Sequence, residues 1–160
     1  KFLAERGMGR LIDHDEALSV LERARQAGLV HMTSNTLDKV EFICNCCPCC
    51  CGLLGTVTRL GAASAKIASN FYAAVSADDC LACGLCEDAC PVEAITLEDV
   101  VVVDQERCIG CGVCVTRCDS GALALVRRET THEPPKDYAT WLIQVALEKD
   151  RLEALSAQMQ

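Results

Sequence analysis

Eight of the chain's 14 cysteines form two copies of one spacing, in which successive cysteines are separated by two, two and three residues. The first copy runs from Cys80 to Cys90 and the second from Cys108 to Cys118. Thiolates at this spacing hold iron–sulfur clusters. Zinc sites instead pair two Cys-x2-Cys elements across a longer gap, and disulfides do not explain a repeat. The repeat therefore predicts iron–sulfur clusters.

The fourth cysteine of each copy is predicted to bind the cluster of the other copy. It is expected to open a short helix that leaves the cysteine loop. Gly84, Gly110 and Gly112 are expected to let the backbone approach and donate N–H groups to cluster sulfurs. The predicted ligands are Cys80, Cys83, Cys86 and Cys118 for one cluster, and Cys108, Cys111, Cys114 and Cys90 for the other.

Residues 71–126, with both cysteine copies and the Cys90-Pro91 pair, resemble the bacterial two-cluster 4Fe-4S ferredoxin family. The resemblance implies a small α+β fold with pseudo-twofold symmetry and two short hairpins beside the clusters. Apolar runs at residues 73–75 and 122–125, and a hairpin pattern over 95–103, support that fold independently. The second copy departs from the family at Asp119, where proline is usual, which concerns local geometry and not ligation.

A second group of six cysteines lies within residues 44–51. Neighbouring cysteines do not reach relaxed disulfide geometry with each other, so the run is predicted to bind metal, first of all as a third iron–sulfur cluster. Zinc or copper thiolate binding and a redox-sensing thiol group stay open. His31 is expected to be a packed surface residue rather than a ligand. The candidate ligands are Cys44, Cys46, Cys47, Cys49, Cys50 and Cys51.

The N-terminal part resembles a group of 4Fe-4S proteins from anaerobes through the segments 7–10, 16–18, 27–31 and the Asn45-Cys46-Cys47 element. In that group a Cys-rich module with the motif Asn-Cys-Cys-x-Cys-Cys-Cys precedes a two-cluster ferredoxin module. Cys50-Cys51-Gly52 is also similar to an element of heterodisulfide reductase catalytic subunits. The resemblance implies electron transfer and further cysteines upstream of Lys1, and whether the chain is a fragment of a longer protein stays open.

The elements predict an α+β protein in three parts. Residues 1–70 form a Cys-rich module with a helix from Asp13 to Gly28 and a hairpin that pairs residues 30–32 with 40–43. Residues 71–128 form the ferredoxin-like two-cluster module, and 129–160 form a linker and an amphipathic helix. The helix stripe, with Trp141 as its anchor, is expected to dock on the body, on a second copy as a homo-oligomer, or on a partner subunit.

The net charge indicates which kinds of partner the chain can bind, and the free thiols indicate its cellular compartment. The formal net charge is −8, and two clusters lower it to about −12. Such a chain is not expected to bind nucleic acid, and a redox partner protein with a basic surface is the expected partner. No apolar run is long enough for a membrane span. Free thiols with oxygen-sensitive clusters predict a reducing, cytoplasmic setting.

No catalytic constellation is found in the sequence, so the predicted function is low-potential electron transfer through several iron–sulfur clusters. The alternative is an iron–sulfur subunit of a multi-subunit redox enzyme, whose N-terminal cluster contacts substrate. Whether the chain is itself an enzyme stays open, with an electron carrier favoured over a catalyst.

Overall fold

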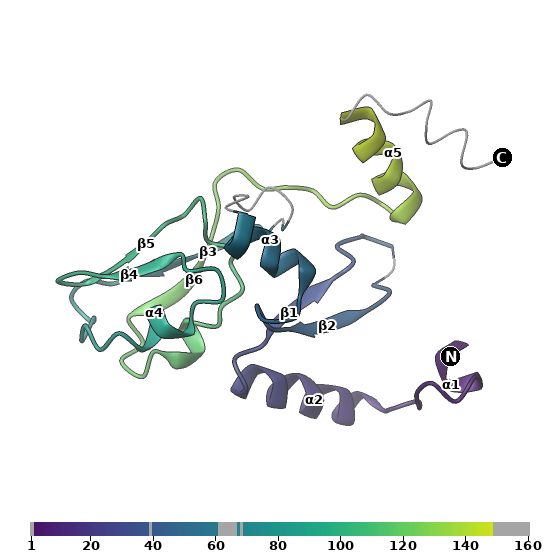
Figure 1. Cartoon of the computed structure of the whole chain (residues 1–160), viewed down its shortest axis with the longest axis horizontal. Coiled ribbons are helices and arrows are strands. Elements are labelled where there is room, and N and C mark those ends of the chain that lie inside the picture. The colour runs from purple at the N-terminus through teal and green to yellow at the C-terminus, as the bar shows by residue number, and fades with distance from the viewer. Residues whose placement is uncertain (1, 39, 61–66, 68, 149–160) are drawn as a thin grey trace.

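The computed structural model describes residues 2–38, 40–60, 67 and 69–148 (Figure 1). In the described residues the strands pair into three two-stranded antiparallel sheets, and short helices lie between them. None of the described helices combines the length and the apolar character that crossing a membrane requires. The elements in chain order are α1 (Phe2–Glu5), α2 (His14–Gln26), β1 (Val30–Thr33), β2 (Ile43–Cys46), α3 (Gly52–Leu60), β3 (Phe71–Val75), α4 (Leu85–Ala89), β4 (Ile95–Leu97), β5 (Val101–Val103), the 3-10 helix η1 (Val115–Arg117), β6 (Leu123–Arg127) and α5 (Tyr138–Glu148).

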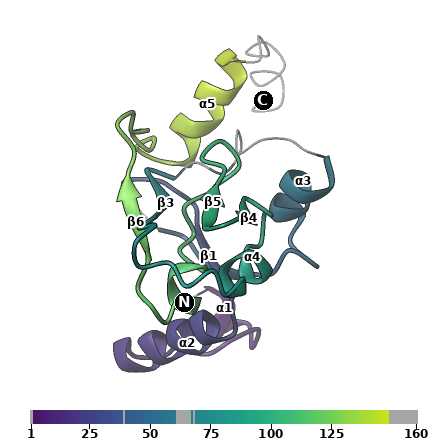
Figure 2. The ribbon, with the colours of Figure 1, turned by 90° about the vertical axis from the view of Figure 1, so that its left-hand side faces the viewer.

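Two of the sheets frame the region of the repeated cysteines. β3 pairs with β6 across the whole module, from Phe71 opposite Arg127 to Val75 opposite Leu123. β4 and β5 form the predicted hairpin around Glu98-Asp99. β3 and β6 lie side by side in both views of the chain (Figures 1 and 2). The apolar runs at both ends of this segment therefore meet, which brings the start and the end of the cysteine region together.

The short helix of each copy ends before the fourth cysteine, so the prediction that the fourth cysteine opens a helix is wrong. α4 ends before Cys90, and η1 ends before Cys118. Both cysteines have extended backbones, with ψ of 112° at Cys90 and 93° at Cys118. Pro91 disfavours a helical conformation at Cys90. Cys118 adopts a similar conformation with Asp119 after it, so the missing proline leaves the local geometry intact.

The N-terminal helix forms as predicted, but the second strand of the hairpin lies further along the chain. Asp13 Oδ1 accepts a hydrogen bond of 2.8 Å from Glu16 N and caps α2. β1 pairs with residues 43–46 and not with the predicted 40–43, because this register places Cys46 opposite Val30, which is buried. Residues 40–42 are exposed and belong to the loop. The strand thus extends into the cysteine run.

One apolar core passes through the N-terminal and ferredoxin-like parts. Leu54 and Val57 on α3 are 0% and 3% exposed, and they belong to the same contiguous cluster as Val30 and Ala73. Apolar side chains at this spacing share one face of a helix, which explains why α3 buries this face. The Cys-rich segment is therefore packed against the ferredoxin-like part through a shared core.

The C-terminal segment runs back over the N-terminal hairpin before α5 begins (Figure 1). Leu37 N and Asp38 N donate to the carbonyls of Pro135 and Lys136 at 3.0 and 2.9 Å. Asp137 Oδ1 accepts from Thr140 N at 2.8 Å and caps α5. The part of the predicted C-terminal helix beyond Glu148 lies outside the described residues.

Candidate metal centres

Cys80, Cys83, Cys86 and Cys118 line one cavity, called here the outer cavity. They surround about 280 Å³ of space free of atoms, part of it open to solvent. Val75, Val101 and Leu123 complete its wall. Cys83 is exposed and Cys86 is buried, so this site has one face toward water.

Cys90, Cys108, Cys111 and Cys114 line a second cavity, called here the inner cavity. The free space is about 310 Å³, part of it open to solvent, and its apolar wall includes Ala73, Ile95 and Ile109. Cys108 and Cys114 are buried, and neither Cys90 nor Cys111 is exposed. The inner cavity is therefore the drier of the two.

Each cavity takes three cysteines from one copy of the repeat and the fourth from the other copy. The reason is geometric: α4 and η1 carry the chain out of each cysteine loop, and the two elements contact one another. The same two sets of four follow from the spacing alone. Four thiols around an apolar space fit a 4Fe-4S cluster, which takes four cysteine thiolates. That these residues bind iron stays a prediction.

Gly110 is the glycine whose replacement the inner cavity tolerates least. Its φ is +64°, a region that residues with a side chain rarely adopt. A Cβ at this position would overlap the carbonyl oxygen of Phe71 and lie 2.6 Å from Ser69 Oγ. The loop between Cys108 and Cys111 thus packs directly on the backbone at the start of β3.

Backbone N–H groups point at cysteine sulfurs in the inner cavity. Ala94 N donates to Cys90 Sγ at 3.2 Å, and Ala73 N donates to Cys108 Sγ at 3.5 Å. Hydrogen bonds to cysteine sulfur stabilise negative charge on a cluster and raise its reduction potential. These two bonds come from alanines on and beside the strands, and the predicted bonds from Gly84, Gly110 and Gly112 to cluster sulfurs stay a prediction.

Burial and hydrogen bonds set the thiol pKa values differently in the two cavities. Burial raises the pKa of Cys114 to about 12 and that of Cys111 to about 11. The hydroxyl of Ser120 lowers the pKa of Cys118 in the outer cavity. Cys111 and Cys114 are therefore protonated at neutral pH unless a cation compensates the charge, and iron supplies that compensation when it binds.

Two arginines hold the loop that contains Cys108, and the sequence analysis did not identify either of them as a site residue. Arg107 donates from Nε to the Val92 carbonyl at 2.6 Å, and its Nη2 lies 2.9 Å from Glu93 Oε2. Arg128 Nη2 donates to the Cys108 carbonyl at 2.7 Å. These contacts join positions 15 and 20 residues apart, for which no periodic pattern gives a signal.

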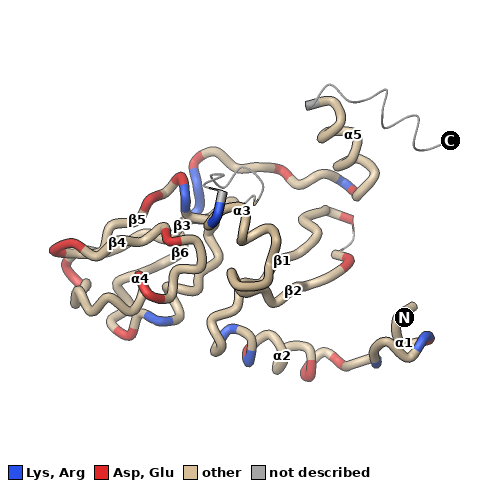
Figure 3. Tube along the Cα trace, viewed as in Figure 1, with Lys and Arg blue, Asp and Glu red and all other residues tan. Residues whose placement is uncertain are grey.

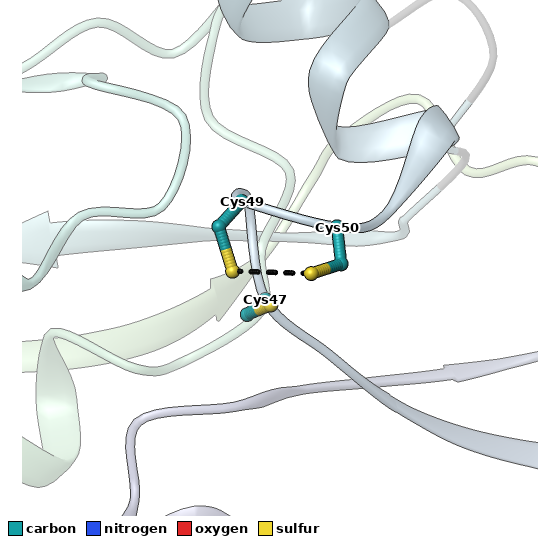
Figure 4. A group of neighbouring side chains, drawn as sticks. All are labelled: Cys47, Cys49 and Cys50. Atoms are coloured by element: carbon teal, nitrogen blue, oxygen red, sulfur yellow. Dashed lines mark hydrogen bonds between the residues drawn. The ribbon is translucent and has the colours of Figure 1, made fainter.

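The six cysteines of the N-terminal run divide between two surroundings. Cys44 and Cys46 lie on β2 and Cys51 directly precedes α3, and the Cys46 thiol interacts with those of Cys51 and Cys44. The other three lie on the turn between β2 and α3, and their sulfurs lie within 4.8 Å of one another (Figure 4). We call Cys47, Cys49 and Cys50 the turn triad.

The thiol pKa values in the run follow these neighbours. Burial first, and then the Cys51 thiol, raise the pKa of Cys46 to about 11. In the turn triad, the hydrogen bond between Cys47 and Cys49 lowers the pKa of Cys47 and raises that of Cys49 to about 11. Cys47 therefore ionises before Cys49.

His31 lies on the opposite face of the hairpin from Cys44 and Cys46. Its ring Nδ1 is 2.8 Å from Asn45 Oδ1, its cross-strand partner. Side chains alternate between the faces of a strand, so the register directs His31 away from Cys46. His31 therefore forms a hydrogen bond at the surface and does not face the cysteines of β2.

Two known families of iron–sulfur domains match the second half of the chain. Residues 79–122 match the family described as 4Fe-4S dicluster domain, and residues 101–151 match the one described as 4Fe-4S single cluster domain. No curated protein matches the chain. With its many cysteines and its mixed helices and short strands, the chain is a ferredoxin-like, α+β iron–sulfur protein with 4Fe-4S domains.

Proposed function

We propose that the chain transfers single electrons at low potential through two 4Fe-4S clusters, one in each cavity. The observation that carries the proposal is the pair of cavities, each lined by four cysteines drawn from both copies of the repeat. A bound 4Fe-4S cluster of the ferredoxin type takes up and releases one electron near −400 mV. The protein's part is to hold the thiolates, exclude water and direct N–H groups at sulfur.

The outer cavity is the proposed exchange point for electrons. Cys83 is exposed, and the neighbouring Leu81 is 76% exposed. Acidic residues lie around α4 and at the β4–β5 turn (Figure 3), and ten acidic residues occur between Ser76 and Asp119 against two arginines. An exposed apolar side chain in a segment of negative charge suits a redox partner with a basic surface.

A third iron–sulfur cluster is proposed at the N-terminal run. Six free thiols within residues 44–51 exceed the need of any fold, and soft thiolates select iron–sulfur clusters, zinc or copper. Since none of the 14 cysteines is in a disulfide, a reducing, cytoplasmic setting fits all three centres.

A second candidate function is that of an iron–sulfur subunit in a larger oxidoreductase. The observation that favours it is the exposure of Cys49 and Cys50, which leaves the N-terminal centre open to a substrate or a partner. In this role the two ferredoxin clusters carry electrons to or from the N-terminal centre. The exposed side chains of α5, Trp141 among them, offer a surface for a partner subunit or a second copy.

Iron and acid-labile sulfide per chain, measured after anaerobic purification and combined with EPR of the reduced protein, test the proposal. Two clusters give about 8 iron and a spectrum of two interacting centres, and a third cluster of the same kind raises iron to about 12. Iron near zero, with zinc on the repeat cysteines, overturns electron transfer. About 8 iron overturns only the third cluster.

A further inference from the structure

The turn triad differs from the cysteines of both cavities in how closely its sulfurs gather. The Sγ atoms of Cys47, Cys49 and Cys50 lie within 4.8 Å of one another, and those of Cys49 and Cys50 are 3.6 Å apart (Figure 4). In the part of the chain that the structure describes, this is the one group of three or more metal-binding side chains that gathers so closely. The eight cavity cysteines are therefore spaced more widely.

The two spacings fit different metal centres. Four sulfurs bound to one zinc ion at about 2.3 Å in a tetrahedron are about 3.8 Å apart. In a 4Fe-4S cluster each thiolate takes a different iron, so the sulfurs are separated by the iron–iron distance as well as by the outward bonds. The 3.6 Å pair of the turn triad matches the edge of a single-ion tetrahedron.

The backbone holds this turn in place. Cys51 N donates to the Cys47 carbonyl at 3.0 Å and closes one helical turn over the triad. Arg59 Nη2 lies 3.4 Å from the Cys49 carbonyl and ties the turn to α3. Leu54 of α3 is completely buried, so the helix that follows the turn is anchored in the core. The three thiols are thus positioned by the fold before any ion binds.

The fourth coordination position is left to a ligand from outside. No described His, Cys, Asp or Glu joins the three sulfurs within the same distance, and Cys49 and Cys50 are exposed. Zinc sites with four protein ligands are structural, whereas sites with three keep one position for water or for an added ligand. A soft thiol is the ligand that best suits a zinc ion already held by three thiolates.

We propose that Cys47, Cys49 and Cys50 bind one zinc ion whose fourth position is open to a thiol from solution. The proposal deepens the metal-binding role of the N-terminal run and rests on it. It leaves Cys44, Cys46 and Cys51 to the third cluster, which are three of the four thiolates that a 4Fe-4S cluster takes. The run then holds two different centres side by side, with the zinc facing solvent.

The test uses the full chain with its iron–sulfur clusters, given one equivalent of Zn²⁺ under anaerobic conditions. X-ray absorption at the zinc edge is expected to show about 3 sulfurs at about 2.3 Å and one lighter atom. Addition of 2-mercaptoethanol is expected to raise the count to about 4 sulfurs. Four sulfurs before any thiol is added, or no response to the thiol, overturns the open position.

Matched variants test which thiols bind the zinc. Cys49→Ser is expected to reduce bound zinc from about 1 to near 0 per chain and to leave the iron content unchanged, whereas Cys44→Ser is expected to keep the zinc. The EPR signal of the two ferredoxin clusters shows that each variant is folded. Equal loss of zinc in both variants, or loss of about 4 iron in Cys49→Ser, overturns the assignment. Absence of that signal from the unmodified chain counts against the proposed electron transfer instead.

Discussion

Arg107 donates a hydrogen bond of 2.6 Å from Nε to the carbonyl oxygen of Val92. Arg107 directly precedes Cys108, and Val92 follows Cys90 by two residues. One side chain therefore joins the two chain segments that deliver cysteines from both copies to the inner cavity. Val92 is 1% exposed, so no water is at hand to replace the arginine.

Replacement of Arg107 by methionine is expected to lower the thermal unfolding midpoint of the clustered protein and to speed loss of the inner cluster. A buried acceptor left without its charged donor costs about 1.5–3 kcal/mol, which for a chain of this size is about 3–12 °C. Thermal unfolding under anaerobic conditions measures the shift. Glu93→Gln is the control, since it removes only the exposed ion pair and keeps the Val92 bond. Equal shifts in the two variants contradict this reading.

Gly110→Ala is expected to destabilise the chain far more than Gly121→Ala. Both glycines have positive φ, of +64° and +71°, so both variants carry the same backbone strain of about 1–2 kcal/mol. A Cβ at Gly121 meets open space, whereas at Gly110 it overlaps the Phe71 carbonyl, which adds about 1–3 kcal/mol. The difference between their unfolding free energies isolates the contact of the cysteine loop with β3. A difference near zero argues against that contact.

Cys114→Ser and Cys83→Ser are expected to have different outcomes. Cys114 is buried in the apolar inner cavity, where no water can take its place at iron, so this variant should lose about 4 iron per chain. Cys83 is exposed, and a hydroxyl or water can complete its cluster there. Iron analysis and EPR distinguish the two: an altered signal with full iron is expected for Cys83→Ser. Loss of the cluster from both variants indicates that exposure does not decide retention.

Arg117→Met is expected to loosen α2 without loss of iron. Arg117 Nη2 donates to the carbonyl of Gln26, the last residue of α2, at 3.2 Å, and a positive charge there also suits the helix C-terminus. Its removal is expected to cost about 1 kcal/mol of local stability. Hydrogen exchange of the α2 amides measures it. Arg25→Met removes a positive charge from the last turn of α2 and an exposed pair with Glu22, but no bond to the Gln26 carbonyl, so its effect should be smaller.

Neutralising charge beside the outer cavity is expected to slow electron transfer to a basic haem protein such as cytochrome c. Asp78→Asn with Asp88→Asn removes two negative charges near the cysteine loop, and the rate should fall several-fold at low salt. Because salt screens the attraction, the difference should shrink at high ionic strength. Asp15→Asn with Glu133→Gln, far along the chain from this loop, is the matched control. Equal rates in all three proteins exclude this face as the docking site.

The sequence was informative where spacing alone determines geometry. Cysteines separated by two residues, such as Cys108 and Cys111, belong to one loop whatever surrounds them, so the contents of both cavities follow from the repeat. The β4–β5 hairpin was also predicted correctly from its local sequence. The register of β2 was not predicted correctly, because it depends on the burial of Val30 and on the C-terminal segment bound at Leu37. Neither contact can be predicted from the local sequence of residues 40–46.

The contacts that hold the two cavities together could not be predicted from the spacing of the cysteines. Arg107 and Arg128 donate hydrogen bonds to backbone carbonyls of residues distant in the sequence. Every residue type has such a carbonyl, so the sequence does not show which one is the acceptor. Within the N-terminal run, six equivalent thiols gave no sign of which would gather. In the structure Cys46 ends β2, whereas Cys47, Cys49 and Cys50 lie between β2 and α3, and the end of β2 depends on its pairing with β1, which lies elsewhere in the chain.

The exchange of cysteines between the two copies also bears on synthesis. The ribosome releases Cys114 before Cys118, so the inner set becomes complete four residues earlier than the outer set, although the outer set began first with Cys80. Neither half of the repeat, expressed by itself, contains a full set. The two copies of the repeat are in this way indivisible: assembly of the proposed clusters must wait for both copies, and the buried site is the first that can be filled.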